Sequence, residues 1–213
     1  MNLNTGTWVV LILCGVLLLG FILGYYYNRQ QAEKIFPWLQ KGLATLGTVT
    51  KGDKLPGMAS GGRLEVNQPV APLRTVETVY LLAPRENLLF WIFSALQGRG
   101  DELIVWVTYQ SKPEQSVEVA RRTNRQYLKR LNDPDKPALT VLENSGRLQL
   151  AAEDKPGSAI IGKVQALLQR YPNSVLRLSL RPDKPHLFLR INLRIMRHAP
   201  AAELFTELKQ LVG

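Results

Sequence analysis

The sequence predicts an α+β fold, in which helices pack on a mixed β-sheet, preceded by a single N-terminal transmembrane helix. The first 28 residues contain no Asp, Glu, Lys or Arg, so the 27 basic and 17 acidic residues all lie in residues 29–213. In that second part, short segments rich in Val, Ile, Leu and Thr alternate with segments whose apolar residues recur at helical spacing. Apolar residues make up 46% of the chain and charged residues 21%, which excludes a disordered protein.

The N-terminal apolar run predicts a membrane anchor over residues 1–28. Residues 7–27 would form a helix about 31 Å long, close to the hydrocarbon thickness of a bilayer. Trp8 lies at one end and Tyr25, Tyr26 and Tyr27 at the other, where aromatic rings favour the headgroup level. Because no basic segment precedes the run and no small-residue cleavage site follows it, we expect a retained anchor and not a cleaved signal peptide.

The charges beside this helix predict its orientation. Arg29, Lys34 and Lys41 follow it, opposed only by Glu33, whereas only the α-amino group is positive before it. Basic flanks stay in the cytoplasm. We therefore expect a single-pass membrane protein with its N-terminus outside and its C-terminal domain in the cytoplasm.

Residues 29–63 are predicted to form a juxtamembrane helix and a flexible linker. Apolar residues over 32–46 fit a short amphipathic helix, which either lies on the lipid headgroups or packs against the domain. Residues 47–63 are punctuated by Gly and Pro and show no apolar period. The cytoplasmic α+β domain is expected over residues 64–213.

Within this domain the apolar patterns predict the following elements in order. Strands are expected at 73–83, 103–110, 116–120, 138–143, 147–151, 175–181 and 186–195, and helices at 87–97, 122–131, 158–171 and 199–212. The strand at 103–110 is nearly all apolar and is expected to be central, with 116–120 as its hairpin partner.

The helix at 87–97 has an unusual pattern, because residues 88–93 are six consecutive apolar residues that surround its axis. A surface helix of a single domain normally shows one apolar stripe. Either this helix is sandwiched inside the fold, or Phe90 and Phe93 contact a membrane or a partner protein.

Two groups of basic residues are candidate phosphate contacts. The helix at 122–131 would carry a ridge that could bind ribosomal RNA or anionic lipid, unless it is merely a solvated face; its members are Arg121, Arg122, Arg125 and Lys129. In the hairpin of 175–181 and 186–195, a turn centred at Asp183 and Lys184 would place Arg177 opposite Arg190. Because like charges directly opposite repel, we expect either a neighbouring Glu or Asp or an external phosphate between them.

The sequence carries no catalytic signature. One Cys and two His exclude a disulfide framework and argue against a metal site, and the carboxylates are scattered singly. We therefore expect no enzyme, no metal, no cofactor and no small-molecule substrate.

The order of elements resembles the calumin family, the coiled-coil-tailed subunit of the endoplasmic-reticulum PAT complex in the multipass translocon. The resemblance is carried by Arg85-x-x-Leu88-Leu89 opening a helix, the strands 101–109 and 117–120, a basic helix ending at Arg130-Leu131, and the strand and turn of 138–146. The chain resembles a short prokaryotic relative without the coiled-coil tail. The resemblance implies a cytosolic α+β domain, an anchor with the same topology, and a place beside ribosomes and insertion machinery.

Together these observations predict a membrane-anchored, cytoplasm-facing interaction protein that assists membrane-protein insertion or assembly near the ribosome and translocon. Its expected partners are the membrane, integral membrane proteins or insertion machinery, with the ribosome or anionic lipid as further candidates. The alternative is a membrane-tethered module that binds anionic lipid or phosphate and has no part in biogenesis.

Overall fold

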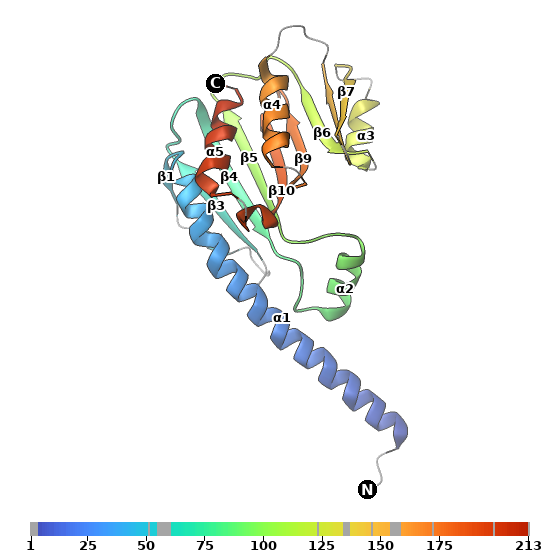
Figure 1. Cartoon of the computed structure of the whole chain (residues 1–213). Helices are drawn as coiled ribbons and strands as arrows, with labels where there is room; N and C mark the ends of the chain where they lie inside the picture. The colour runs from blue at the N-terminus through green and yellow to red at the C-terminus, as the bar shows by residue number, and fades with distance from the viewer. Residues whose placement is uncertain are drawn as a thin grey trace.

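The computed structural model describes residues 4–50, 52–54, 61–122, 124–133, 137–145, 147–153, 159–171, 173–197 and 199–212. A long N-terminal helix leads into a single sheet covered by shorter helices (Figure 1). The predicted α+β fold with one N-terminal candidate span is therefore confirmed.

The first helix, α1, runs without a break over Thr5–Leu43, 39 residues or about 58 Å. The predicted membrane helix and the predicted juxtamembrane helix are thus one helix. The residues between them, 28–31, are Asn, Arg, Gln and Gln, and no Gly or Pro is present to end the helix there. Pro37 lies inside α1, where its ring removes one backbone hydrogen bond.

The sheet has ten strands in the order β1-β3-β4-β5-β10-β9-β6-β8-β7, with β2 paired to β3. The strand bounds are β1 Thr48–Val49, β2 Asp53–Lys54, β3 Gly61–Asn67, β4 Leu73–Leu81, β5 Glu102–Tyr109, β6 Val117–Arg121, β7 Thr140–Ser145, β8 Leu148–Ala152, β9 Val175–Leu180 and β10 Leu187–Asn192. Strands β1, β2 and the first residues of β3 lie in the segment 47–63 that was expected to be a flexible linker. In its described part, this segment belongs to the sheet.

All strand pairs in the described residues are antiparallel, where a mixed sheet was expected. A parallel neighbour needs a crossover over the face of the sheet. The helix between β4 and β5 instead protrudes beyond the sheet end, and the chain returns at that same end (Figure 1).

The expected hairpin of the strands at 103–110 and 116–120 is wrong. Strand β5 pairs with β4 and β10, and β6 pairs with β8 and β9. The β9–β10 hairpin therefore lies between β5 and β6 and supplies both with a neighbour. The nearly all-apolar β5 is central, as its composition predicted.

Four helices and one short 3-10 helix complete the domain: α2 Leu88–Leu96, α3 Arg125–Leu131, α4 Ala159–Arg170, η1 Leu193–Arg197 and α5 Ala201–Gln210. The C-terminal part of α1, together with α4 and α5, covers one face of the sheet (Figure 1). The main core lies between these helices and the inward side chains of the strands, such as Val105, Leu178 and Leu189.

The second half of α1 belongs to this core. Ile35, Leu39 and Leu43 are at most 2% exposed, and the indole of Trp38 donates to the carbonyl of Ala199 at 3.2 Å. A Cβ on Gly42 would lie 2.4 Å from the Cβ of Ala201, so only glycine permits this close crossing of α1 and α5. Of the two alternatives for residues 32–46, packing on the domain is confirmed for the described residues.

The opposite face of the sheet is covered at one end only. There Tyr127 of α3 packs on Ala120 and Ala151, whose neighbours along β6 and β8 point to the main core. On β3 and β4 the same face is open to solvent, with Glu65 and Thr75 exposed.

Candidate functional site

The N-terminal half of α1 is an exposed apolar surface. It is the one helix in the described chain that is long and apolar enough to cross a membrane, and none of its most apolar stretch is buried. Trp8 near its N-terminal end is 54% exposed, and Tyr25, Tyr26 and Tyr27, at the end of the apolar stretch nearer the domain, are also exposed. This distinguishes α1 from the core helix of a soluble domain, whose apolar side chains would be covered.

A polar clamp ties α1 to the start of the α2 segment. Arg85 donates two hydrogen bonds to the carboxylate of Asp101, at 2.8 and 2.9 Å, and a third to the side-chain oxygen of Asn28 at 2.9 Å. The amide of Asn28 donates to the carbonyl of Ala83 at 3.0 Å and to Glu86. Two parallel bonds from one guanidinium to one carboxylate fix geometry as well as charge, so this clamp sets the position of α2.

Helix α2 stands beside α1 with its side chains exposed on nearly every side. Asn87 caps it by accepting from the amide of Phe90 at 3.1 Å, and Ser94 is its buried residue. Phe90 is 56% exposed and Phe93 58%. The expectation of a helix sandwiched inside the fold is therefore wrong, and the alternative of an outward apolar surface agrees with the structure.

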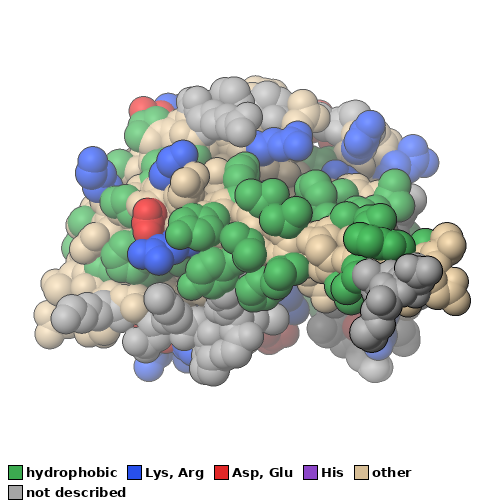
Figure 2. All heavy atoms as spheres, turned by 90° about the horizontal axis from the view of Figure 1, so that it is seen from below, with side chains coloured by type: hydrophobic (Ala, Val, Ile, Leu, Met, Phe, Trp, Pro, Cys, Tyr) green, Lys and Arg blue, Asp and Glu red, His purple; other side chains and the backbone are tan. Residues whose placement is uncertain are grey.

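The exposed side chains of α1 and α2 lie on the same side of the molecule. Figure 2 shows hydrophobic side chains gathered across this underside, with Lys and Arg around the margin. A surface of this kind with basic edges is typical of contact with a membrane or another apolar partner.

The predicted basic ridge is not one face of a helix. Helix α3 begins at Arg125, so Arg121 ends β6 and Arg122 lies in the turn before α3. Arg121, Arg122 and Lys129 are exposed, and the side chain of Arg125 is outside the described set. Leu128 on the same helix is 42% exposed.

Arg121 instead lines a pocket of about 340 Å³ between the end of α2 and the start of α3. Three guanidinium groups border it, from Arg99, Arg121 and Arg190, with Glu102 as the acidic residue. Its remaining lining residues are Gln97, Gly98, Asn124 and Leu176. The sequence did not indicate this pocket, because its basic residues come from a loop and two separate strands.

The predicted pairing of Arg177 with Arg190 across the β9–β10 hairpin is confirmed. The acidic residues come from the neighbouring strands: Arg190 bonds Glu102 on β5 at 2.5 Å, and Arg177 lies 3.8 Å from Glu118 on β6. The internal alternative therefore holds, and these two arginines do not need an external phosphate.

Glu118 is itself almost fully buried and accepts a hydrogen bond from the hydroxyl of Ser179. Burial raises the pKa of its carboxyl above the usual 4.5, and the Ser179 bond and Arg177 oppose that rise. This arrangement is a structural ion cluster beneath α3.

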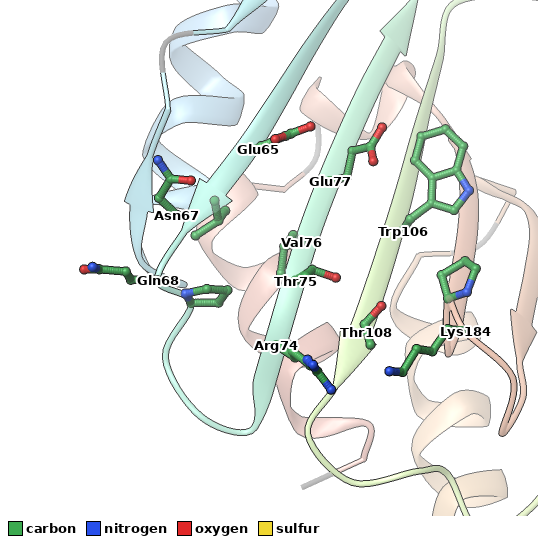
Figure 3. A pocket seen from close by; sticks show the side chains of 13 residues that line it. Glu65, Asn67, Gln68, Arg74, Thr75, Val76, Glu77, Trp106, Thr108 and Lys184 are labelled. Carbon is green, nitrogen blue, oxygen red and sulfur yellow. The ribbon is translucent and has the colours of Figure 1, made fainter.

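The open face of the sheet carries a groove of about 770 Å³ that sequence reasoning missed. Figure 3 shows Glu65 and Glu77 at one end, Arg74 and Lys184 at the other, and Trp106 along one side. Strict alternation places Glu65, Glu77 and Trp106 on the outer face of three adjacent strands, which is the signal that could have revealed it. Arg63 forms ion pairs with both carboxylates, at 2.5 Å to Glu65 and 2.9 Å to Glu77, so the acidic end of the groove is partly neutralised within the chain.

In the part of the chain that the structure describes, the His, Cys, Asp and Glu side chains are scattered. There, no group of three or more His, Cys, Asp or Glu side chains could hold a metal ion. His186 is buried, accepts from the amide of Tyr109 at 3.1 Å and stacks on its ring. Burial lowers the pKa of this imidazole, which favours its neutral form.

No family model matches this chain, and no curated protein matches it. The resemblance to the calumin family therefore stays a prediction that depends on the order and spacing of the elements.

Proposed function

We propose that this chain is a membrane-anchored interaction protein, with its folded domain in the cytoplasm, that assists the insertion or assembly of membrane proteins. The observation that carries the proposal is the continuity of α1. One helix bears the exposed apolar stretch and also contributes Ile35, Leu39 and Leu43 to the domain core. A domain built on its own anchor is held at a fixed height above the bilayer.

Tethering of this kind raises the concentration of the domain near other membrane proteins without a tight interface. The cytoplasmic orientation draws support from Arg29, Lys34 and Lys41, which follow the apolar stretch. The groove between the Glu65 end and the Arg74 end offers a surface for a polypeptide partner. The resemblance to the calumin family favours the same role.

Site-specific photo-crosslinking tests this function in intact membranes. A photoreactive residue replaces Thr75, which is exposed in the groove, or Thr206, which is exposed on α5 across the sheet. We expect adducts with insertion machinery or newly made membrane proteins from position 75 and none from position 206. Absence of such adducts at position 75, or equal yield from both positions, would contradict the proposal.

The alternative function, binding of anionic lipid or phosphate, is favoured by the pocket that Arg99 and Arg121 border, in which Arg190 is already paired with Glu102. Its test is capture of anionic vesicles by the full chain held in zwitterionic nanodiscs. The alternative is supported if vesicle capture weakens as salt rises, is lost in Arg121→Glu, and is kept in Lys129→Glu, whose site lies outside the pocket. Equal loss in both variants would show a diffuse charge effect and remove this alternative.

A further inference from the structure

The position of α2 on α1 fixes its depth along the apolar stretch. A Cβ on Gly24 would lie 2.1 Å from the carbonyl oxygen of Arg85, and a Cβ on Gly20 would lie 3.4 Å from the side chain of Leu88. The start of α2 thus rests directly on the backbone of α1 at these two glycines. Both precede Tyr25, and Gly20 lies about 7 Å along the helix axis from it.

This depth lies within the part of α1 that the proposed anchor places in the bilayer. With Tyr25, Tyr26 and Tyr27 at the headgroup level, Leu88 is below that level and inside the acyl chains. The clamp of Asn28, Arg85 and Asp101 lies on the domain side, where polar groups meet headgroups and water. Arg85 also lies over the ring of Tyr27, 4.6 Å from its centre.

The chemistry of α2 matches this depth. Its exposed apolar residues point in every direction around the axis: Leu89, Phe90, Trp91, Ile92, Phe93 and Leu96. A partner protein would cover one side of such a helix and leave the others in water, whereas lipid surrounds it completely. At nine residues, or about 13 Å, α2 is too short to cross a bilayer.

We propose that α2 is a second membrane-embedded element, a short helix that enters the lipid leaflet beside the inner end of α1 without crossing it. This inference rests on the membrane anchorage in the proposed function and adds a second site of lipid contact to it. The hydrophobic surface of α1 continues onto α2 on the underside of the molecule (Figure 2). The occupant of this surface is the acyl and headgroup boundary of the bilayer that holds α1.

Depth-dependent fluorescence quenching tests the inference on the full chain in liposomes. Cys14 is the only cysteine, so a Cys14→Ala background accepts a single labelling site. The sites are Phe93→Cys and Leu96→Cys on α2, Leu18→Cys on α1, and Val70→Cys in the β3–β4 loop; all four native side chains are exposed. Each receives an environment-sensitive dye, which is exposed in turn to spin-labelled lipid and to aqueous iodide.

We expect labels on α2 to behave like the Leu18 label, with blue-shifted emission, quenching by spin-labelled lipid and protection from iodide. The Val70 label should show the opposite pattern. If iodide quenches the labels on α2, the inference is wrong. If spin-labelled lipid still quenches the Leu18 label in that case, the membrane anchor itself is unaffected. Protection from both quenchers also overturns the inference, because a second copy of the chain would then cover α2. An iodide-accessible Leu18 label would instead refute the anchor itself.

Discussion

The coupling of the anchor to the folded domain can be tested by replacing Leu39 with Ala. Leu39 has no exposed surface and lies in the main core, although it belongs to the same helix as the apolar stretch. Removing a fully buried Leu side chain costs about 2–5 kcal/mol, through lost burial and the cavity that remains. Leu23→Ala is the matched control, because Leu23 is 68% exposed in the same helix; we expect its effect to stay within about 0.5 kcal/mol.

The assay is urea unfolding of the full chain in detergent micelles, followed by circular dichroism. With a urea slope of about 2 kcal/mol per molar, the Leu39→Ala loss corresponds to a midpoint lower by roughly 1–2.5 M. Equal midpoints for Leu39→Ala and Leu23→Ala would refute the reasoning. In that case the second half of α1 would lie outside the core, and the domain would hang on a flexible tether.

Three further predictions concern polar contacts. Arg85→Lys cannot keep both hydrogen bonds to Asp101 and should lower the free energy of unfolding by about 1–3 kcal/mol. Because the Ala83 amide donates to the same carboxylate, its hydrogen exchange should become faster, while exchange at the amides of β9 should stay unchanged. Glu102→Gln should lower the urea midpoint, because it leaves Arg190 and Arg177 facing each other with one negative charge fewer beside them. The control Glu203→Gln removes an exposed ion pair with Arg170 and should leave the midpoint unchanged. Burial raises the pKa of Glu118 in the folded state, so its contribution to stability is present below pH about 4.5 and is lost as pH rises through the folded pKa. The free energy of unfolding of Glu118→Gln should therefore rise relative to that of the parent protein as pH rises through this range. A difference that stays constant with pH would contradict the expected direction.

Local patterns predicted the elements that are determined by neighbouring residues. The β9–β10 hairpin forms in the predicted register because a short turn connects its strands, and Arg177 faces Arg190 as a result. The apolar stretch of α1 was predicted equally well, since length and apolar composition alone identify a helix that could cross a membrane. Its continuation to Leu43 was not predicted, because the first charged residues normally mark the end of a membrane-spanning stretch, although Asn, Arg and Gln permit a helix.

Pairings between distant segments could not be predicted in this way. Strand β6 alternates as a hairpin strand should, but nothing in its own residues shows that β9 and not β5 is its neighbour. The groove on the open sheet face was missed for the same reason. Its residues come from β3, β4, β5 and the β9–β10 turn, and only the three-dimensional pairing brings them together.

The two alternatives for α2 stayed open for a different physical reason. A helix that is apolar all around fits a protein interior and a lipid environment equally well, so periodicity does not distinguish them. Two glycines in the apolar stretch were the available signal, because Gly20 and Gly24 lie four residues apart on one side of α1 and permit close approach of another segment. Their partner, however, is the start of α2 and not another membrane-crossing helix.

A second lipid contact changes what the anchor can do for the domain. A single helix fixes the height of the domain but permits the helix, and the domain with it, to tilt in any direction relative to the membrane normal. If α2 lies in the leaflet as proposed, at a distance from the α1 axis, tilting α1 away from α2 would pull Phe90, Phe93 and Leu96 out of lipid, and tilting it toward α2 would drive the polar clamp into lipid. The free energy of transferring those side chains, about 1.5–3 kcal/mol for each fully exposed large one, holds the domain in one orientation. The groove with Trp106 and the Arg121 pocket then keep constant directions relative to the membrane plane, which is what a surface for laterally diffusing partners requires.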